Sequence, residues 1–265
     1  MSDQQYTRRL SIHRILIAFW AIDLLAIIAL LWYPISIGIL QLALVVAVAS
    51  IWLLTFVILR RKRKIAIAVA AMGIAAALFL ALPGRNVDLT SLRTEYVSRL
   101  QAYAGTPYVW GGESRRGIDC SGLIRRAMID AQARIGLRTA NPRALRTALD
   151  LWWHDCSALA LRDEYRAVTV PLFSAESINS IGNASLLPGD IAVTANGKHV
   201  LAYLGEQTWI QADPGQGKVV ALAAPHTNGW FHQPVRVMRW SYLRQTTSDQ
   251  VSNAQPSPSD PGSGS

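Results

Sequence analysis

Three long apolar segments occupy the first third of this 265-residue chain, at 15–33, 35–59 and 65–82. Each is close to or above the length of about 20 residues that an α-helix needs to cross the hydrocarbon core of a bilayer. Lipid offers the backbone no hydrogen-bond partners, so segments of this kind must be helical there. We therefore expect a membrane anchor with three transmembrane helices over residues 1–84 and a separate folded domain over 85–244.

The basic residues indicate how this anchor is oriented. Three arginines precede the first segment and a run of five Lys and Arg fills positions 60–64, whereas the connection at Tyr33-Pro34 carries no basic residue. Since positively charged loops stay in the cytoplasm, we expect everything after Pro83 to lie outside it. The alanine-rich third segment is the weakest of the three, and without it the domain would be cytoplasmic.

The composition narrows the class of protein further. The formal net charge of +9 is concentrated beside apolar segments, which favours a membrane surface over nucleic acid as the partner. Two cysteines in a chain of this length form no disulfide framework. We find no zinc-ligand spacing, phosphate-binding loop or dinucleotide fingerprint, so we expect neither a metal nor a cofactor.

A glycine-bounded aromatic turn delivers one cysteine to the start of an apolar, helix-like segment. The turn is Gly105-Thr106-Pro107-Tyr108-Val109-Trp110-Gly111-Gly112, and Asp119-Cys120-Ser121-Gly122 follows. Helix N-termini favour anions, so a cysteine at this place tends toward the nucleophilic thiolate. Much later, His199 opens an alternating segment that predicts a strand. A cysteine on a helix start facing a histidine on a strand is an arrangement for nucleophilic catalysis.

Two further motifs are Leu187-Pro188-Gly189-Asp190 and the segment from His199-Val200 to Tyr203-Leu204-Gly205. Together with the turn and the cysteine motif, they make residues 93–243 resemble the NlpC family of papain-like cell-wall cysteine peptidases. The resemblance implies an α+β domain in which a helix-borne cysteine packs on an antiparallel sheet. It implies an endopeptidase of the bacterial inner membrane, with its domain on the periplasmic or extracellular side. The substrate would be peptidoglycan stem peptides, cut between γ-D-glutamate and the diamino acid.

The catalytic group follows from the same resemblance. Cys120 is the nucleophile, and His199 is the base that holds the thiolate and then protonates the leaving amine. A third polar residue must orient the imidazole, and the family's position on the next strand falls on Gln211. Asp213 lies on the same face of that strand and is the alternative.

Other residues near the cysteine receive supporting roles. The backbone N–H of Cys120 is an oxyanion donor, and Tyr108 resembles the family's active-site tyrosine. By resemblance, Asp119 and Ser121 hold the free amino terminus of the substrate peptide. Cys156 is expected to be a bystander, although a disulfide with Cys120 would silence the enzyme.

The remaining helices and strands are expected from the periodicity of apolar residues and from the Gly, Pro and Asn residues that mark turns. Helices are expected over 90–104 and from Cys120 to about 133, and the long 134–185 segment is expected to be an insertion. Within it we expect a helix over 142–152, with Asn141 as its N-cap, and a strand near 168–172. We expect five further strands at 190–194, 199–204, 208–212, 218–223 and 235–240. The Ser-, Pro- and Gly-rich tail, 245–265, is expected to be disordered.

Two other functions stay open at this point. One is an amidase or acyltransferase on the same fold, because one scaffold hosts several thiol acyl chemistries. The other is a non-catalytic membrane protein that binds the cell wall, which the presence of both Cys120 and His199 disfavours. The pair Trp152-Trp153 is expected to dock the insertion, with a substrate wall as the alternative.

Overall fold

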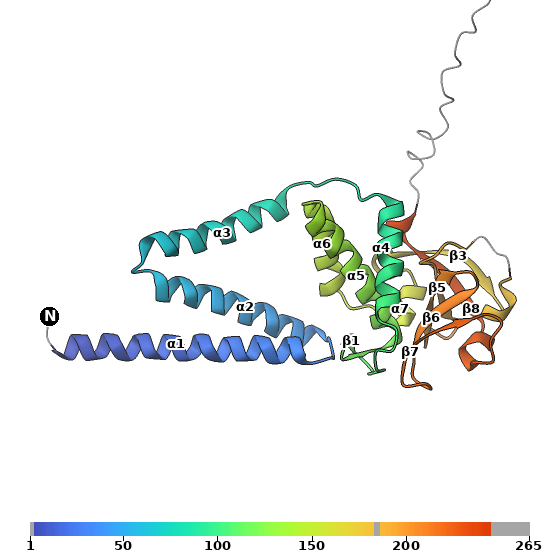
Figure 1. Ribbon diagram of the computed structural model, residues 1–265, viewed down its shortest axis with the longest axis horizontal. Coiled ribbons are helices and arrows are strands. Elements are labelled where there is room, and N and C mark those ends of the chain that lie inside the picture. The colour runs from blue at the N-terminus through green and yellow to red at the C-terminus, as the bar shows by residue number, and fades with distance from the viewer. Residues whose placement is uncertain (1–2, 183–185, 245–265) are drawn as a thin grey trace, which may run out of the picture.

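The computed structural model describes residues 3–182 and 186–244, with side chains from residue 12 onward. Three long helices extend from one side of an α+β domain (Figure 1): α1 (Asp3–Trp32), α2 (Gly38–Leu59) and α3 (Arg63–Ala81). All three are long and apolar enough to cross a membrane. The three predicted segments are therefore confirmed as helices, whereas the predicted disordered tail, 245–265, lies outside the described residues.

The helices α1 and α2 form a hairpin in which two pairs of polar side chains are hydrogen-bonded from one helix to the other. The Trp20 indole donates to the Thr55 hydroxyl (2.9 Å), and the Ser50 hydroxyl donates to Asp23 (2.6 Å). A polar group in an apolar environment is costly without a partner. The Asp23 carboxylate of α1 is thus held by a hydrogen bond from the neighbouring helix.

Four helices build one layer of the domain: α4 (Leu89–Ala102), α5 (Cys120–Arg138), α6 (Pro142–Trp153) and α7 (Ala158–Arg162). Side-chain caps fix where α5 and α6 begin. Asp119 accepts from the backbone N–H of Gly122 at the start of α5, and Asn141 accepts from Arg143 at the start of α6. Both starts are confirmed, and α5 continues five residues beyond its expected end near 133. More than half of the residues of α5 are buried, and the helix packs against α4, α6 and the sheet.

A six-stranded antiparallel sheet forms the second layer, in the order β3-β8-β4-β5-β6-β7. Its strands are β3 (Thr169–Ala175), β4 (Ile191–Thr194), β5 (Val200–Gly205), β6 (Thr208–Asp213), β7 (Lys218–Ala223) and β8 (Val235–Trp240). Two short strands, β1 (Glu113–Ser114) and β2 (Gly117–Ile118), pair separately in front of α5. The α+β class, with a helix-borne cysteine on an antiparallel sheet, is confirmed. Apolar side chains from α4, α5 and the facing sheet surface form the main core.

The segment 134–185 is part of this framework. It contains the end of α5, then α6 and α7, and β3, which pairs with β8 at the sheet edge. Short 3-10 turns complete the domain at 165–167, 178–180, 229–232 and 241–243. Figure 1 shows α6 between α3 and α5, so this segment also faces the anchor.

Candidate active site

A network of backbone and carboxylate hydrogen bonds fixes the turn before Cys120. The Asp119 N–H donates to the Gly112 carbonyl (3.0 Å), and one Asp119 oxygen accepts from the Gly111 N–H (2.8 Å). The other accepts from the Gly122 N–H (2.6 Å). A Cβ at Gly122 would lie 2.3 Å from the Gly112 oxygen, so only glycine fits there. The first turn of α5 is therefore tied directly to the glycine-rich loop.

Cys120 is the first residue of α5 and its thiol is almost fully buried, with 8% of the residue exposed. Burial raises the pKa of the thiol to about 12, the Asp119 charge raises it further, and the backbone N–H groups of Val200, Ser121 and Cys120 oppose this. The helix start does favour the thiolate, as expected, but burial outweighs it here. The thiol of the free protein is therefore neutral, and it lies beside the amide of Val200, the residue that follows His199.

His199 lies just before β5 and is buried against two partners. Its Nε2 is 2.6 Å from the Gln211 Oε1, and its ring stacks on Trp230 with centroids 4.1 Å apart. Burial lowers the pKa of His199 to about 4, although the Gln211 hydrogen bond and the Asp213 charge raise it. The imidazole is therefore neutral at neutral pH and free to accept a proton.

Gln211 and Asp213, the two candidates for the orienting residue, form a chain of polar contacts that leads to His199. The Gln211 amide nitrogen faces the Asp213 carboxylate (3.5 Å), which also accepts from the Asn228 side chain (2.6 Å). Because a carboxylate accepts hydrogen bonds, the Gln211 NH₂ must face Asp213 and its oxygen must face His199. His199 then donates from Nε2, which leaves Nδ1 unprotonated as the proton acceptor.

Tyr108, Asp119 and Ser121 all lie at the cysteine. Burial raises the pKa of Tyr108 to about 12, and its proximity to Cys120 and to the Asp119 carboxylate adds to this. The Ser121 hydroxyl donates to Asp119 (3.0 Å). The Asp119 carboxylate thus already accepts three hydrogen bonds from its own loop, and a substrate ammonium group would have to share it.

A cleft of about 290 Å³ opens in front of Cys120. Its walls come from the 108–113 turn, the start of α5, the 155–158 segment before α7, the 197–198 turn, and residues 35–37 of the anchor. Glu113 and Arg125 form a buried ion pair in its wall (2.6 Å), and Arg125 also reaches Asp155 (3.1 Å). Burial raises the pKa of Glu113, and the charge of Arg125 opposes this.

The sequence did not single out Trp230, Glu113, Arg125, Asn228 or the 35–37 segment. Trp230 stands in an aperiodic segment, and a lone aromatic there carries no pattern. The ion pair joins the short strand β1 to a helix interior, so its partners become visible only in three dimensions. Trp110 belongs to the aromatic turn, and the sequence does not show that its side chain is exposed at the cleft.

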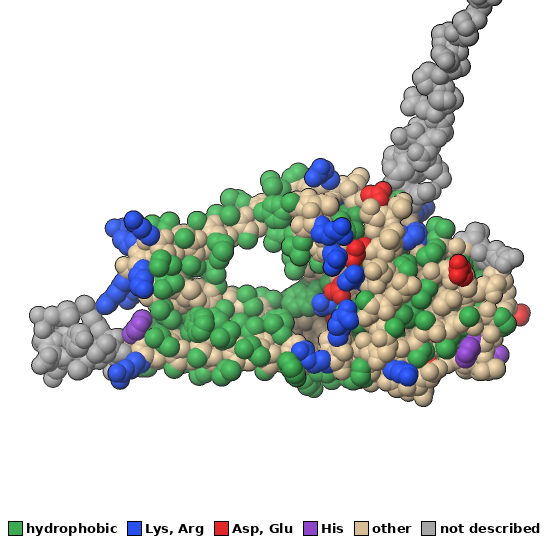
Figure 2. All heavy atoms as spheres, in the orientation of Figure 1, with side chains coloured by type: hydrophobic (Ala, Val, Ile, Leu, Met, Phe, Trp, Pro, Cys, Tyr) green, Lys and Arg blue, Asp and Glu red, His purple; other side chains and the backbone are tan. Residues whose placement is uncertain are grey.

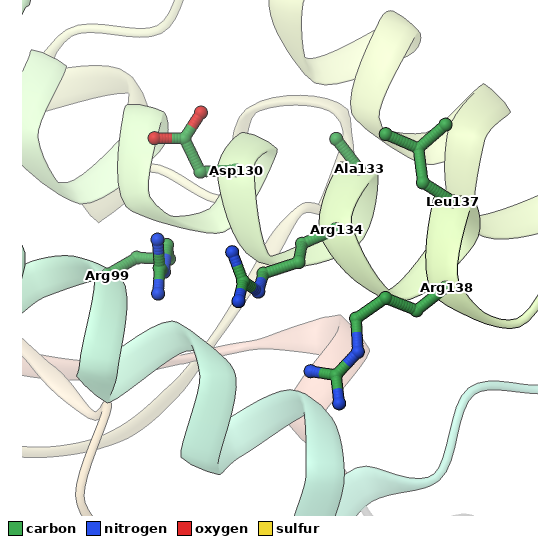
Figure 3. Close-up of a pocket in the computed structure, with 6 residues that line it drawn as sticks. All are labelled: Arg99, Asp130, Ala133, Arg134, Leu137 and Arg138. Carbon is green, nitrogen blue, oxygen red and sulfur yellow. The ribbon is translucent and has the colours of Figure 1, made fainter.

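A second and larger hollow, about 750 Å³, lies between α4 and α5 and contains no nucleophile. Figure 3 shows Arg99, Arg134 and Arg138 extending into the space between these helices. Glu95 pairs with Arg99 (2.9 Å) and Arg134 (3.2 Å). The Glu95–Arg134 pair joins the two helices. Because no nucleophile lines this hollow, the cleft at Cys120 is the candidate active site.

The other cysteine, histidine and tryptophan residues considered from the sequence are not part of the proposed catalytic group. Both cysteines are free, and Cys156 is buried. His226 packs against Phe231 and accepts from the Asn228 N–H. The Trp152 side chain packs against the main core, and its carbonyl accepts from Gln41 of α2 (2.7 Å). Within residues 3–182 and 186–244, no group of three or more side chains is suited to hold a metal ion.

A family model described as the NlpC/P60 family matches residues 105–239, just over half of the chain. A curated protein of Haemophilus influenzae named "Probable endopeptidase" is 61% identical over 28 residues, which are 11% of this chain and 17% of that protein. The chain thus matches less than a fifth of that relative's length.

Solved structures with a similar fold include NlpC1 from Trichomonas vaginalis, with a TM-score of 0.38, 18% identity, and coverage of 59% of this chain and 46% of that one. The peptidoglycan hydrolase RipB from Mycobacterium tuberculosis has a TM-score of 0.37 and 21% identity, with coverage of 60% and 67%.

Proposed function

Because the chain belongs to the NlpC/P60 family, we propose that it is a membrane-anchored cysteine endopeptidase that hydrolyses peptidoglycan stem peptides. One observation carries the proposal: Cys120 at the start of α5 lies beside the strand that follows His199, and His199 is oriented by Gln211. The bond between γ-D-glutamate and the diamino acid is the one that the family resemblance implies.

The charge states of the free protein favour a general-base mechanism. His199 Nδ1 takes the proton of the Cys120 thiol as the sulfur attacks the peptide carbonyl. The developing oxyanion is stabilised by the Cys120 backbone N–H and the Tyr108 hydroxyl. His199 then gives the proton to the leaving amine, which departs and leaves an acyl-enzyme. Water, deprotonated by His199, hydrolyses the thioester and restores the thiol.

The distribution of basic residues supports an exported domain. Figure 2 shows hydrophobic side chains along the three helices and basic side chains at the end that lies away from the domain. The turn between α2 and α3 carries the run at 60–64. By the positive-inside rule that end is cytoplasmic. We infer a multi-pass protein of the inner membrane whose domain lies on the periplasmic or extracellular side.

The test is hydrolysis of defined soluble muropeptides by the purified full-length protein in detergent. Wild type and Cys156→Ala are expected to release a fragment ending in γ-D-glutamate, and Cys120→Ala is expected to release none. Cys156 is the matched control because it is the other buried free cysteine. Intact muropeptides in the presence of a Cys120 thiol that an alkylating probe modifies would contradict the peptidase function and indicate another acyl substrate.

A further inference from the structure

The turn between α1 and α2, residues 33–37, is joined to the active-site loop by backbone hydrogen bonds. The Ser36 N–H donates to the Gly111 carbonyl (3.1 Å), and the Glu113 N–H donates to the Pro34 carbonyl (2.9 Å). Ile35 pairs with Gly112 as an isolated antiparallel bridge. Gly112 in turn accepts from Asp119, next to the cysteine. The anchor turn therefore extends the scaffold that positions Cys120.

The same turn forms a wall of the cleft. Ile35, Ser36 and Ile37 line it together with Cys120 and Tyr108. Two apolar side chains and a hydroxyl of the anchor thus lie where a substrate peptide must bind. This wall precedes the part of the chain that resembles the family, so it is a feature of this anchor.

Polar contacts at three helix ends keep the anchor and the domain in one arrangement. Arg116 stacks on Trp32 at the end of α1 (3.7 Å) and donates to the Leu31 carbonyl (3.3 Å). Gln41 of α2 is 3% exposed and binds the Trp152 carbonyl. At the end of α3, Arg146 donates to the Leu80, Leu82 and Pro83 carbonyls. Arginine is well suited to bind several free helix-end carbonyls at once.

With the three helices across a membrane, as proposed above, these contacts put the cleft at its surface. The helix α1 ends at Trp32 and α2 begins at Gly38, so the turn lies within a headgroup region only about 5–8 Å thick. Trp110, on the rim of the cleft, is 82% exposed, and Trp32 is 65% exposed. Exposed tryptophan is typical of the membrane–water interface. A peptide must come down to the headgroups to reach Cys120.

We propose that residues 35–37 are part of the substrate-binding cleft and that the protein acts on stem peptides attached to a lipid carrier in the same membrane. The inference rests on the proposed peptidase function and names its substrate class. A peptide on a membrane-embedded carrier is held at the depth of the cleft, and confinement to one surface raises its effective concentration. A cross-linked wall strand has no such restraint toward the bilayer.

The test uses full-length protein in vesicles and one stem peptide in three forms: soluble, linked directly to a lipid carrier, and linked through a long flexible spacer. The directly linked form is expected to be cut about tenfold faster or more than the soluble form, and the spacer is expected to bring no gain. A rate that rises with the spacer, or equal rates for the soluble and direct forms, would overturn the inference while leaving the peptidase function intact. No cleavage of any form would overturn both.

Two matched variants test the wall itself. Ile37→Ala shortens a side chain that lines the cleft, whereas Ile39→Ala shortens one on α2 that is 71% exposed and outside the cleft. Ile37→Ala is expected to raise KM for the linked peptide several-fold, with unchanged alkylation of Cys120 by a small reagent. Ile39→Ala is expected to match wild type. Equal KM values for both variants would overturn the assignment of this wall.

Discussion

At the scale of single residues, burial decides the charge state of the proposed catalytic pair. The pKa of Cys120 is raised to about 12 and that of His199 is lowered to about 4. A thiol is more than half ionised only above its pKa, and an imidazole is protonated only below its own. Between these two values both groups are neutral, so the reaction must begin with proton transfer and not from a stored thiolate.

This charge state predicts the pH profile of alkylation. Iodoacetamide is expected to modify Cys120 slowly at neutral pH. The rate is expected to rise about tenfold for each pH unit, because below the pKa the thiolate fraction rises by the same factor. Mass spectrometry of the Cys156→Ala protein, which has no second thiol, measures that rate. A fast rate that is flat through neutral pH would show a preformed ion pair and contradict the neutral pair.

A second prediction concerns Asp213. With Asp213→Asn, the Gln211 amide loses its carboxylate acceptor and can turn its nitrogen toward His199. The imidazole would then carry its proton on Nδ1, where it cannot accept one from the thiol. We expect kcat to fall by about 10²-fold or more with little change in KM, since a wrong tautomer is costly in related triads. Steady-state kinetics on a muropeptide measure the separate effects on kcat and KM.

The control for Asp213 is Asp163→Asn, which changes an exposed aspartate that pairs with Arg162. It is expected to behave as wild type. Loss of kcat with a raised KM and a lowered melting temperature in Asp213→Asn would indicate a structural role only. Unchanged kcat would remove Asp213 from the catalytic group.

The positions of the three proposed catalytic residues in the fold could be predicted because they lie in contiguous motifs. Cys120, His199 and Gln211 each stand at a recognisable place in a helix start or strand. Trp230 and Asn228 could not, because they come from a 3-10 turn that the topology carries back to the sheet. Their contribution depends on tertiary contacts that leave no periodic pattern in the sequence.

At the scale of elements, N-cap and proline residues predicted where helices begin better than the sequence predicted where they end. Asn141-Pro142 marks the first turn of α6, and the structure begins that helix there. The helix α5 runs past its expected end near 133 and includes Gly136, where α6 crosses and a Cβ would come 2.7 Å from Leu145. A glycine required by helix packing therefore has the same sequence appearance as a helix stop.

The start of α5 gives a third prediction. Gly122→Ala would place a Cβ 2.3 Å from the Gly112 carbonyl, and backbone on both sides leaves little room to relax. We expect a destabilisation of about 1–3 kcal/mol and loss of peptidase activity, because the loop that positions Cys120 must shift. Thermal unfolding and muropeptide hydrolysis measure the two effects.

Gly229→Ala is the matched control, since nothing lies within 4 Å of a Cβ there. It is expected to leave the melting temperature and the activity unchanged. If Gly122→Ala were as active as Gly229→Ala, the loop and α5 would not be as tightly coupled as the hydrogen bonds of Asp119 indicate.

At the scale of the whole molecule, the anchor and the domain are less separate than the sequence implies. Hydropathy predicts a boundary near 84, and the helix bounds agree with it. The contacts across that boundary join side chains to backbone carbonyls far away in the sequence. Gln41 binds the carbonyl of Trp152, and Arg146 binds the carbonyl of Pro83, 63 positions earlier. A carbonyl is present at every residue, so no sequence pattern marks the ones that are bound.

The last prediction is the sidedness of the molecule. In a protein without its natural cysteines, Ser98→Cys places an exposed thiol on α4, and Lys62→Cys places one in the turn between α2 and α3. If all three helices cross the membrane, these positions lie on opposite sides. A membrane-impermeant maleimide is expected to label Ser98→Cys in spheroplasts and to label Lys62→Cys only after permeabilisation.

The pattern of labelling separates the possible topologies because each predicts a different pair of results. Protection of both positions would mean that α3 does not cross, which leaves the domain in the cytoplasm and the cleft away from any wall peptide. Labelling of Lys62→Cys alone would mean an inverted anchor. Only labelling of Ser98→Cys alone is compatible with a cleft that faces outward at the membrane surface, since the ends of α1 and α3 and the start of α2 all contact the domain.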